Sequence, residues 1–179
     1  ICVFSIKKLM KSNKNIVFLG MMGSGKTSIG KLFSKKLKLD FIDIDEQIEI
    51  ETGLSIAEIF KIKGEKKFRE LEEKITLKVL DKKRIIVSLG GGSFLNKKIR
   101  DEILDNHLSV WLDWEDRILI KRIKNSMKRP LALKASTIEL SNLIKKRSNI
   151  YSKALYKIKC DNLSKTDIIK KILKIYETY

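Results

Sequence analysis

Glycine, lysine and threonine stand near the start of the chain at the spacing of a phosphate-binding loop. Residues 20–27 read Gly-Met-Met-Gly-Ser-Gly-Lys-Thr, which fits the P-loop pattern G-x-x-x-x-G-K-[ST]. Glycines here let backbone N–H groups close on a phosphate chain at the N-terminus of the following helix. The pattern predicts a nucleotide site with Lys26 on the β- and γ-phosphates and the Thr27 hydroxyl on Mg²⁺. The residues expected to bind ATP in this loop are Gly23, Ser24, Gly25, Lys26, Thr27 and Ser28.

Two aspartates, Asp43 and Asp45, end the next apolar segment. On an extended chain their spacing directs both carboxylates to one side. One could then hold Mg²⁺ through water while the other takes a proton from an acceptor hydroxyl. Two exposed acids would be the simpler explanation, but residues 40–60 carry seven acids and no Lys or Arg in an otherwise cationic chain. Beside a P-loop, this acidic stretch favours a metal or hydroxyl site.

Three consecutive glycines, Gly90, Gly91 and Gly92, follow a third apolar segment, where many P-loop proteins have a metal-binding acid. They could form a flexible loop. The interpretation we favour is that bare backbone approaches a small ligand and donates hydrogen bonds from its N–H groups.

Arginine is scarce, with 7 residues against 32 lysines, so each arginine weakly indicates the planar, bidentate geometry that lysine cannot supply. Taken singly, each fits a solvated position; Arg69, for example, lies four residues from both Glu65 and Glu73, the spacing of an exposed ion-pair ladder. We expect three arginines to be surface residues: Arg84, Arg100 and Arg117. Four remain as candidates: Arg69, Arg122, Arg129 and Arg147.

The segments that must position these residues alternate between strand-like and helical patterns. Strands are expected at 16–19, 41–44, 84–89, 108–112 and 155–159. Helices are expected at 26–37, at 45–82 with breaks near 52–53 and 64, at 96–105, at 115–125, up to about 153, and from 164. This alternation predicts an α/β fold of three layers, with helices on both faces of a mostly parallel five-stranded sheet.

Composition narrows the class of protein. The 179 residues are 43% hydrophobic, as expected for one globular domain. The net charge of +17 comes from lysines spread along the chain without basic–aromatic alternation, so we expect a solvated lysine coat and no specific nucleic-acid partner. A nucleic-acid-binding P-loop protein remains the alternative from a different class. No apolar run reaches the roughly 18 residues that span a membrane.

Reactive side chains exclude further classes. Two cysteines and one histidine argue against a disulfide scaffold, a zinc site and a Ser-His-Asp hydrolase, and they fit a reducing, cytoplasmic environment.

Together these residues resemble the shikimate kinase family of P-loop small-molecule kinases. The match runs from about Asn15 to Tyr179, which we expect to be a single domain, while residues 1–14 are expected to be a disordered extension. A P-loop alone is not specific to this family, but its conjunction with the other motifs is. The segments that carry the resemblance are GMMGSGKTSIGKLFSKKL, FIDIDEQIEIETGLSIAEIF, GEKKFRELEE, VSLGGG, KRPL and KKRSNIY.

The resemblance implies an activity and a fold. The activity is phosphorylation of the shikimate 3-hydroxyl by ATP, giving shikimate 3-phosphate and ADP in the biosynthesis of chorismate and the aromatic amino acids, with one Mg²⁺ per site. The fold is that of the nucleoside-monophosphate kinases, with a helical substrate-binding segment at about 45–82 and a mobile lid at about 124–137. We expect a monomer. A gluconate kinase of the same fold is the nearest alternative.

The resemblance also implies roles for single residues. Asp45 is the base on the acceptor hydroxyl, and Asp43 acts on Mg²⁺ through water. Arg69 and Arg147 clamp the shikimate carboxylate. The remaining roles fall to Gly90, Gly91 and Gly92 at the ring hydroxyls, Arg129 on the phosphates as the catalytic lid arginine, Arg122 near the adenine, Phe60 and Phe68 as an apolar wall, and Glu72 orienting Arg69.

Overall fold

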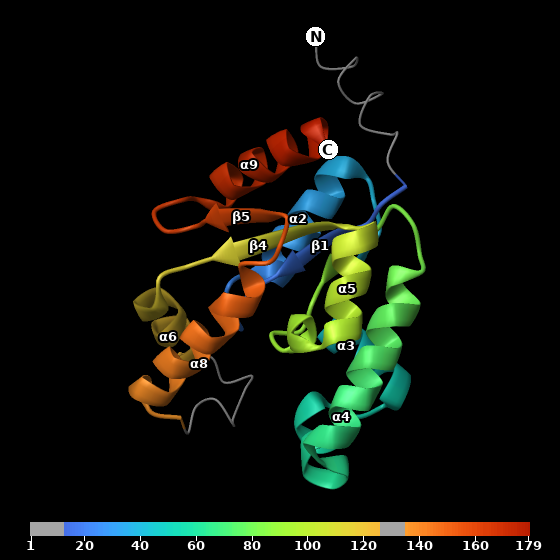
Figure 1. Ribbon diagram of the computed structural model, residues 1–179, viewed down its shortest axis with the longest axis vertical. Helices are drawn as coiled ribbons and strands as arrows, with labels where there is room; N and C mark the ends of the chain where they lie inside the picture. The colour runs from blue at the N-terminus through green and yellow to red at the C-terminus, as the bar shows by residue number, and fades with distance from the viewer. Residues whose placement is uncertain (1–12, 126–134) are drawn as a thin grey trace.

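A parallel sheet of five strands forms the centre of the protein (Figure 1). The computed structural model describes residues 13–125 and 135–179. Within them the strand order is β2-β3-β1-β4-β5, and every pairing is parallel. The strands are β1 (Ile16–Leu19), β2 (Phe41–Asp43), β3 (Ile86–Ser88), β4 (Leu108–Asp113) and β5 (Tyr156–Lys159).

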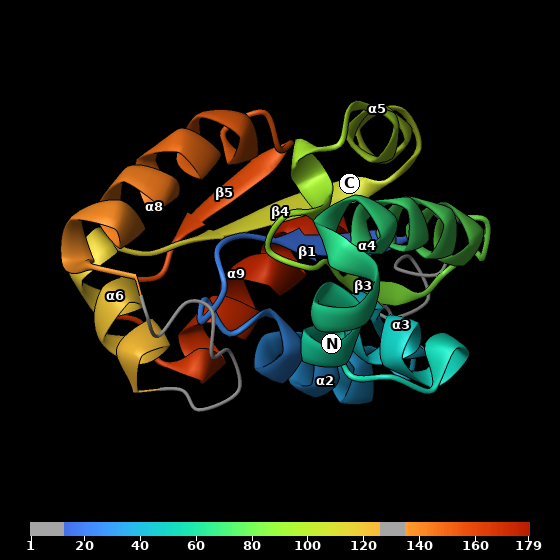
Figure 2. The same cartoon turned by 90° about the horizontal axis from the view of Figure 1, so that it is seen from below.

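Helices cover both faces of this sheet, as the view in Figure 2 shows. One face packs against α2 (Lys26–Leu37) and α9 (Lys165–Thr178). The other packs against α4 (Ile56–Leu80), α5 (Lys97–Asn106) and α8 (Thr137–Tyr151). Two shorter helices, α3 (Ile44–Thr52) and α6 (Asp116–Lys124), contribute to that second face. The predicted three-layer α/β/α fold is confirmed.

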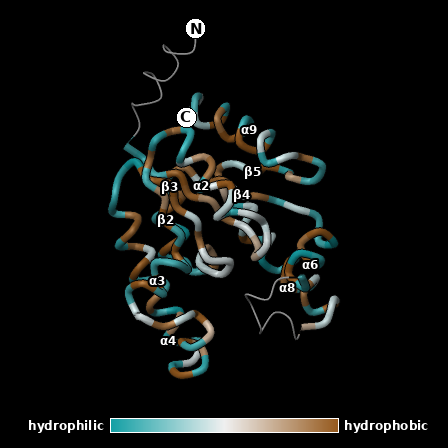
Figure 3. Tube along the Cα trace, turned by 180° about the vertical axis from the view of Figure 1, so that it is seen from behind, coloured by the Kyte–Doolittle hydropathy of each residue, from teal (hydrophilic) through white to brown (hydrophobic). Residues whose placement is uncertain are grey.

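Alternation along the strands explains why there are two cores. In β1, Ile16 and Phe18 join the α2–α9 side, while Val17 and Leu19 join the α4–α5–α8 side. A strand buried on both faces reads as an uninterrupted apolar run, because successive side chains point to opposite faces. Figure 3 accordingly shows hydrophobic residues gathered in the sheet around β3. None of the helices within the described ranges is long and apolar enough to cross a membrane.

The acidic helical stretch is two helices with a break inside the second. Gly53, with φ 67°, ends α3, and Ser55 and Glu58 form a capping box that starts α4. Inside α4, Gly64 has φ 75° and ψ 170°, outside helical geometry. Both breaks agree with the sequence prediction. The short 3₁₀ helix η1 (Ser93–Leu95) was not predicted.

The carboxyl ends of β1, β2 and β3 meet at one edge of the sheet. The P-loop follows β1, Asp43 ends β2, and Gly90 to Gly92 follow β3. Because β3 lies between β2 and β1, the segment with the three glycines leaves the sheet between the ends of these two strands. Open α/β sheets bind their ligands at this edge.

Candidate active site

The P-loop turns sharply between β1 and α2. Gly20, Gly23 and Gly25 have φ values of 142°, 79° and 88°, a region that side chains disfavour. The buried Lys26 side chain folds back along the loop, where its Nζ donates to the carbonyls of Gly20 at 2.9 Å and Met21 at 3.1 Å. The predicted strand–loop–helix context of the P-loop is therefore present.

Thr27 and Asp43 meet in front of this loop. The Thr27 hydroxyl donates to Asp43 Oδ2 at 2.6 Å. Asp43 Oδ1 accepts from the backbone N–H groups of Asp45 at 3.0 Å and Glu46 at 3.4 Å, so Asp43 is the N-cap of α3.

This cap corrects the predicted geometry of the two aspartates. The strand ends at Asp43 and Asp45 lies in the first turn of α3, so the extended two-residue spacing was wrong. The chain turns here because the cap satisfies N–H groups that a helix start leaves without partners. Both carboxylates still face one cavity of about 220 Å³, lined by Gly23, Gly25, Lys26, Thr27, Ser28, Asp43, Asp45, Ser88 and Leu89.

The donors in this cavity suit Mg²⁺ better than a transition metal. No group of three or more His, Cys, Asp or Glu side chains able to hold a metal occurs within the described ranges. The Thr27 hydroxyl and the Asp43 carboxylate are hard oxygen ligands already side by side. Mg²⁺ is commonly held by one or two carboxylates together with water and substrate phosphates, so this pair fits it.

The glycine loop, which we define as Gly90, Gly91 and Gly92, lies among three charged side chains. A methyl group built on Gly90 would lie 2.7 Å from Asp45 Oδ1, and one on Gly92 would lie 2.5 Å from Arg69 Nη1. On Gly91 it would lie 3.5 Å from Arg147 Nη1. Charged residues from three separate helices therefore converge on three successive glycines.

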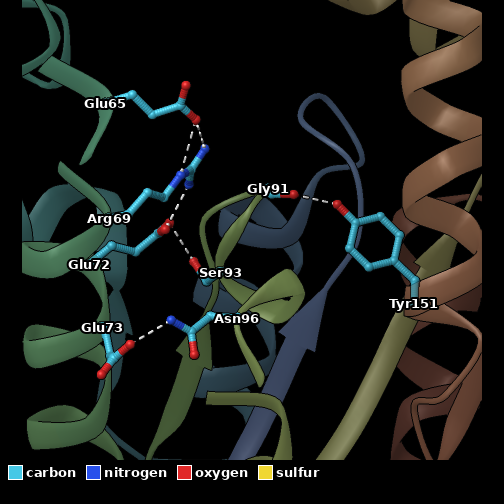
Figure 4. A network of polar contacts seen from close by, with 8 residues as sticks. All are labelled: Glu65, Arg69, Glu72, Glu73, Gly91, Ser93, Asn96 and Tyr151. Carbon is cyan, nitrogen blue, oxygen red and sulfur yellow. Dashed lines mark hydrogen bonds and ion pairs between the residues drawn. The ribbon is translucent and has the colours of Figure 1, made fainter. Parts of the chain in front are cut away.

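Arg69 is held by two carboxylates on its own helix (Figure 4). Its Nη1 donates to Glu72 Oε2 at 2.7 Å, and its Nη2 lies 3.2 Å from Glu65 Oε1. Burial lowers the pKa of Arg69, but Glu72 and Glu65 outweigh this and hold that pKa above its ordinary value. The predicted role of Glu72 in orienting Arg69 agrees with this contact.

Glu73, the other residue predicted to pair with Arg69, points elsewhere. Its carboxylate accepts from Asn96 Nδ2 at 2.7 Å and from Lys98 Nζ at 2.8 Å. Of the two ion pairs in the expected ladder, the one with Glu65 is present and the one with Glu73 was wrong. Arg69 faces the glycine loop, and the buried Glu72 carboxylate is its shorter contact.

Aromatic rings border the Arg69 side of the site. The Phe60 and Phe68 rings lie 4.6 Å apart between centroids, and the Arg69 guanidinium lies 5.1 Å from the Phe68 ring. An apolar surface beside a cationic group suits an acid with a hydrocarbon ring.

On the opposite side, α8 presents Arg147. Its Nη1 lies 3.6 Å from Met21 Sδ, and among the described residues its buried Nε has no hydrogen-bond partner. One helical turn later, the Tyr151 hydroxyl donates to the Gly91 carbonyl (Figure 4). Tyr151 was not among the predicted site residues.

Arg122 and Trp114 stack on each other, and both contact the P-loop. The Arg122 guanidinium lies 3.8 Å from the Trp114 ring centroid, and its Nη1 donates to the Gly23 carbonyl at 3.3 Å. The Trp114 indole in turn donates to the Ser24 carbonyl at 2.9 Å. Trp114 was missed, although a tryptophan directly after a strand that borders the P-loop strand is a signal. A cavity of about 660 Å³ opens here, lined by Arg117, Ile118, Lys121, Arg122 and Asn125.

The other two arginines to report are Arg129 and Arg100. Arg129 lies outside the described residues, as does most of the segment 124–137. Arg100, expected as a plain surface residue, donates to the carbonyls of Phe94 at 3.1 Å and Leu95 at 3.0 Å and so fixes the end of η1.

Comparisons with known proteins agree with this geometry. The family model described as shikimate kinase matches residues 22–177. The chain is 43% identical over 169 residues to a shikimate kinase of Bacillus subtilis, covering 90% of this chain and 88% of that protein. It is 38% identical over 165 residues to one of Thermodesulfovibrio yellowstonii, covering 92% and 95%.

Solved structures separate the two kinase alternatives. Shikimate kinase from Acinetobacter baumannii in complex with shikimate superposes with a TM-score of 0.87 at 29% identity, covering 95% of this chain and 96% of that one. A gluconokinase from Sinorhizobium meliloti reaches a TM-score of 0.59 at 17% identity, covering 92% and 91%, which shows a shared fold alone. The chain belongs to the shikimate kinase family, whose reaction is the ATP-dependent phosphorylation of shikimate.

Proposed function

We propose that the cavity in front of the P-loop and the adjoining surface of the glycine loop are where this chain transfers the γ-phosphoryl group of ATP to the 3-hydroxyl of shikimate. One observation carries this proposal. Asp45, Arg147 and Arg69, from three different helices, each lie against one of three successive glycines. A base and two cationic forks around bare backbone suit a small hydroxylated acid.

The nucleotide binds on the P-loop side in this proposal. Residues 23–28 surround the phosphates, with the Lys26 ammonium supplying positive charge to the β- and γ-phosphates. Arg122, which rests on Trp114, is proposed to lie beside the adenine base. Arg129, outside the described residues, is proposed to act on the phosphates from the segment 124–137.

Thr27 and Asp43 are the residues proposed to hold Mg²⁺, Asp43 through water. When bound, Mg²⁺ neutralises charge that develops on the transferred phosphoryl group. The hydrogen bond between the two side chains keeps both oxygens on the cavity side of the P-loop. Asp43 is also the N-cap of α3, so the residue that would hold the metal also orients the helix that carries Asp45.

Asp45 is proposed as the base for the acceptor. The shikimate 3-hydroxyl oxygen forms a bond to the γ-phosphorus, the bond to the ADP oxygen breaks, and the hydroxyl proton passes to the Asp45 carboxylate. Phosphoryl transfer of this kind depends on positioning and charge more than on covalent catalysis. Arg69 and Arg147 supply the positioning by holding the shikimate carboxylate from both sides.

The ring of shikimate occupies the space between these groups in this proposal. The glycine backbone donates to ring hydroxyls, and Phe60 and Phe68 border the hydrocarbon part of the ring. We further propose that residues 15–179 form one domain that includes the substrate-binding segment 45–82, and that it works as a cytoplasmic monomer without a specific nucleic-acid partner. Light scattering after size-exclusion chromatography tests the oligomeric state.

A coupled ADP-release assay with ATP and Mg²⁺ tests the reaction, comparing shikimate, gluconate and no acceptor. We expect turnover with shikimate alone, and loss of that turnover in Lys26→Ala. Release of ADP that does not depend on shikimate, with ATP still bound, would contradict the proposed acceptor while leaving the nucleotide site intact.

A further inference from the structure

The two helices that carry the arginines also hold the glycine loop, each through a second side chain one turn further along. On α4, Glu72 follows Arg69 by three residues, and on α8, Tyr151 follows Arg147 by four, so each pair lies on one helix face. Glu72 Oε1 accepts from the Ser93 hydroxyl at 2.7 Å, directly after the loop. The Tyr151 hydroxyl donates to the Gly91 carbonyl, within the loop (Figure 4).

Tyr151 is buried, with 2% of its surface exposed, and its ring lies 5.9 Å from that of Trp111 on β4. A phenylalanine would fill the same apolar space. A hydroxyl placed in such surroundings costs free energy unless it forms a hydrogen bond. The contact with Gly91 is therefore a feature that distinguishes tyrosine from phenylalanine at this position.

Fixing the Gly91 carbonyl fixes more than one atom. A trans peptide is planar, and none of the described peptide bonds is cis. The N–H of Gly92 belongs to the same peptide plane as the Gly91 carbonyl and points in the opposite direction, away from Tyr151. One hydrogen bond therefore sets the orientation of the peptide that lies between Arg147 and Arg69.

Ser93 holds the other end of the glycine loop through its contact with Glu72 on α4. Its hydroxyl and the Glu72 carboxylate are both buried, and Glu72 Oε2 is the acceptor for Arg69 Nη1 at 2.7 Å. Arg69, Glu72 and Ser93 thus form one continuous chain of contacts. A displacement of the loop at Ser93 displaces the carboxylate that orients Arg69.

We propose that Tyr151 and Ser93 are positioning residues that hold the glycine loop at a fixed place between Arg69 and Arg147, and so set the gap into which the acceptor carboxylate fits. This inference rests on the proposed function, in which the two arginines bind that carboxylate. Three successive glycines have wide conformational freedom in solution. Tethering them from both helices prepares the gap before the acceptor arrives, which reduces the entropy lost on binding.

The test is a set of kinetic measurements on Tyr151→Phe and Ser93→Ala. The matched control is Tyr156→Phe, because Tyr156 is partly buried and packs against the core on the other face of the sheet. We expect Tyr151→Phe to raise the KM for shikimate about three- to tenfold, the factor that the loss of one hydrogen bond gives. Ser93→Ala is expected to raise it similarly. The KM for ATP should stay within about twofold in both variants, and Tyr156→Phe should change neither constant.

An acceptor analogue separates positioning from general loosening. In an analogue whose carboxylate is reduced to a primary alcohol, the arginines have no anion to bind, so we expect Tyr151→Phe and the unchanged protein to differ less than they do with shikimate. A lowered melting temperature with an unchanged KM for shikimate would assign Tyr151 to packing alone and overturn the inference.

Failure of this inference and failure of the proposed function give different results. If Tyr151→Phe does not fold, Ser93→Ala decides the matter, and an unchanged KM for shikimate in it overturns the inference. If the unchanged protein has no shikimate-dependent turnover, the proposed function fails instead.

Discussion

Gly92 lies so close to Arg69 that a methyl group on its α-carbon would lie 2.5 Å from the guanidinium Nη1. Its backbone, with φ −109° and ψ −17°, is open to any residue. Glycine is needed here for space and not for backbone conformation. The loop leaves room for the guanidinium, which Glu65 and Glu72 hold in place.

Gly92→Ala is therefore expected to displace Arg69 while leaving the fold intact. The added methyl meets the end of a flexible side chain, so the melting temperature should change little. The KM for shikimate should rise about tenfold, because one charge-assisted contact to the carboxylate is lost. Gly91→Ala is the comparison, since its methyl would meet Arg147 Nη1 at an ordinary 3.5 Å, although the Met22 backbone nitrogen lies at 3.3 Å. Equal KM values for the unchanged protein and Gly92→Ala would mean that Arg69 does not bind the acceptor.

Arg69→Lys keeps the charge but removes the fork. A single ammonium cannot face the acceptor carboxylate and Glu72 with the same geometry. We expect the KM for shikimate to rise about tenfold or more and kcat to change less than about threefold. Steady-state kinetics with shikimate varied at saturating ATP measures this, with Arg84→Lys, at the opposite end of β3, as the control. An unchanged KM would show that the fork is not used.

Asp45→Asn preserves size and removes the proton acceptor. We expect kcat to fall about 10²- to 10⁴-fold, the usual contribution of a positioned general base, with little change in the affinity for ADP. Asp40→Asn, an exposed substitution just before β2, serves as the control. A kcat within a few-fold of the original would assign the base to another group.

His107 makes stability depend on pH below neutrality. Its ring is buried, Nδ1 accepts from the Asn15 backbone N–H at 3.4 Å, and Nε2 lies 3.4 Å from Glu102 Oε1. Burial lowers the pKa of His107 below the ordinary value of 6.5, with Glu102 opposing part of this effect. The folded protein therefore binds fewer protons at this site than the unfolded chain does.

Above pH 6.5, neutral His107 contributes fully to the free energy of unfolding. As the pH falls from 6.5 through the lowered pKa of the folded state, this contribution is lost. Urea unfolding between about pH 5 and pH 8 measures this. His107→Gln should show a shallower fall than the unchanged chain. If the two profiles are parallel, His107 does not account for the pH dependence.

Much of the fold and part of the site could be predicted from local sequence. The P-loop, the order of the elements and the breaks at Gly53 and Gly64 all follow from patterns within a few residues. The grouping of Asp43 with Asp45 was right although the assumed extended geometry was wrong, because capping competed with strand continuation at Asp43.

The contacts that the sequence did not predict join segments far apart in the chain. Tyr151 meets Gly91, Ser93 meets Glu72, and Trp114 meets Ser24, and in each case an ordinary core or loop residue gains its role from a distant neighbour. For a related reason, the sequence did not show whether Arg69 pairs with Glu72 or with Glu73. Both carboxylates are within reach of Arg69 along the helix, but Asn96 and Lys98 of the α5 region engage Glu73.

The central position of β1 has a consequence for synthesis on the ribosome. Ile16 pairs with Ile86 on one side and with Leu108 on the other, so the strand that leads into the P-loop gains both neighbours only after β4 has been translated. Pairing across such sequence separations is slow, because loop closure comes before any gain from the contacts. A nascent chain that ends before residue 108 is thus expected to lack nucleotide affinity, and ATP can stabilise only polypeptides that have passed this length.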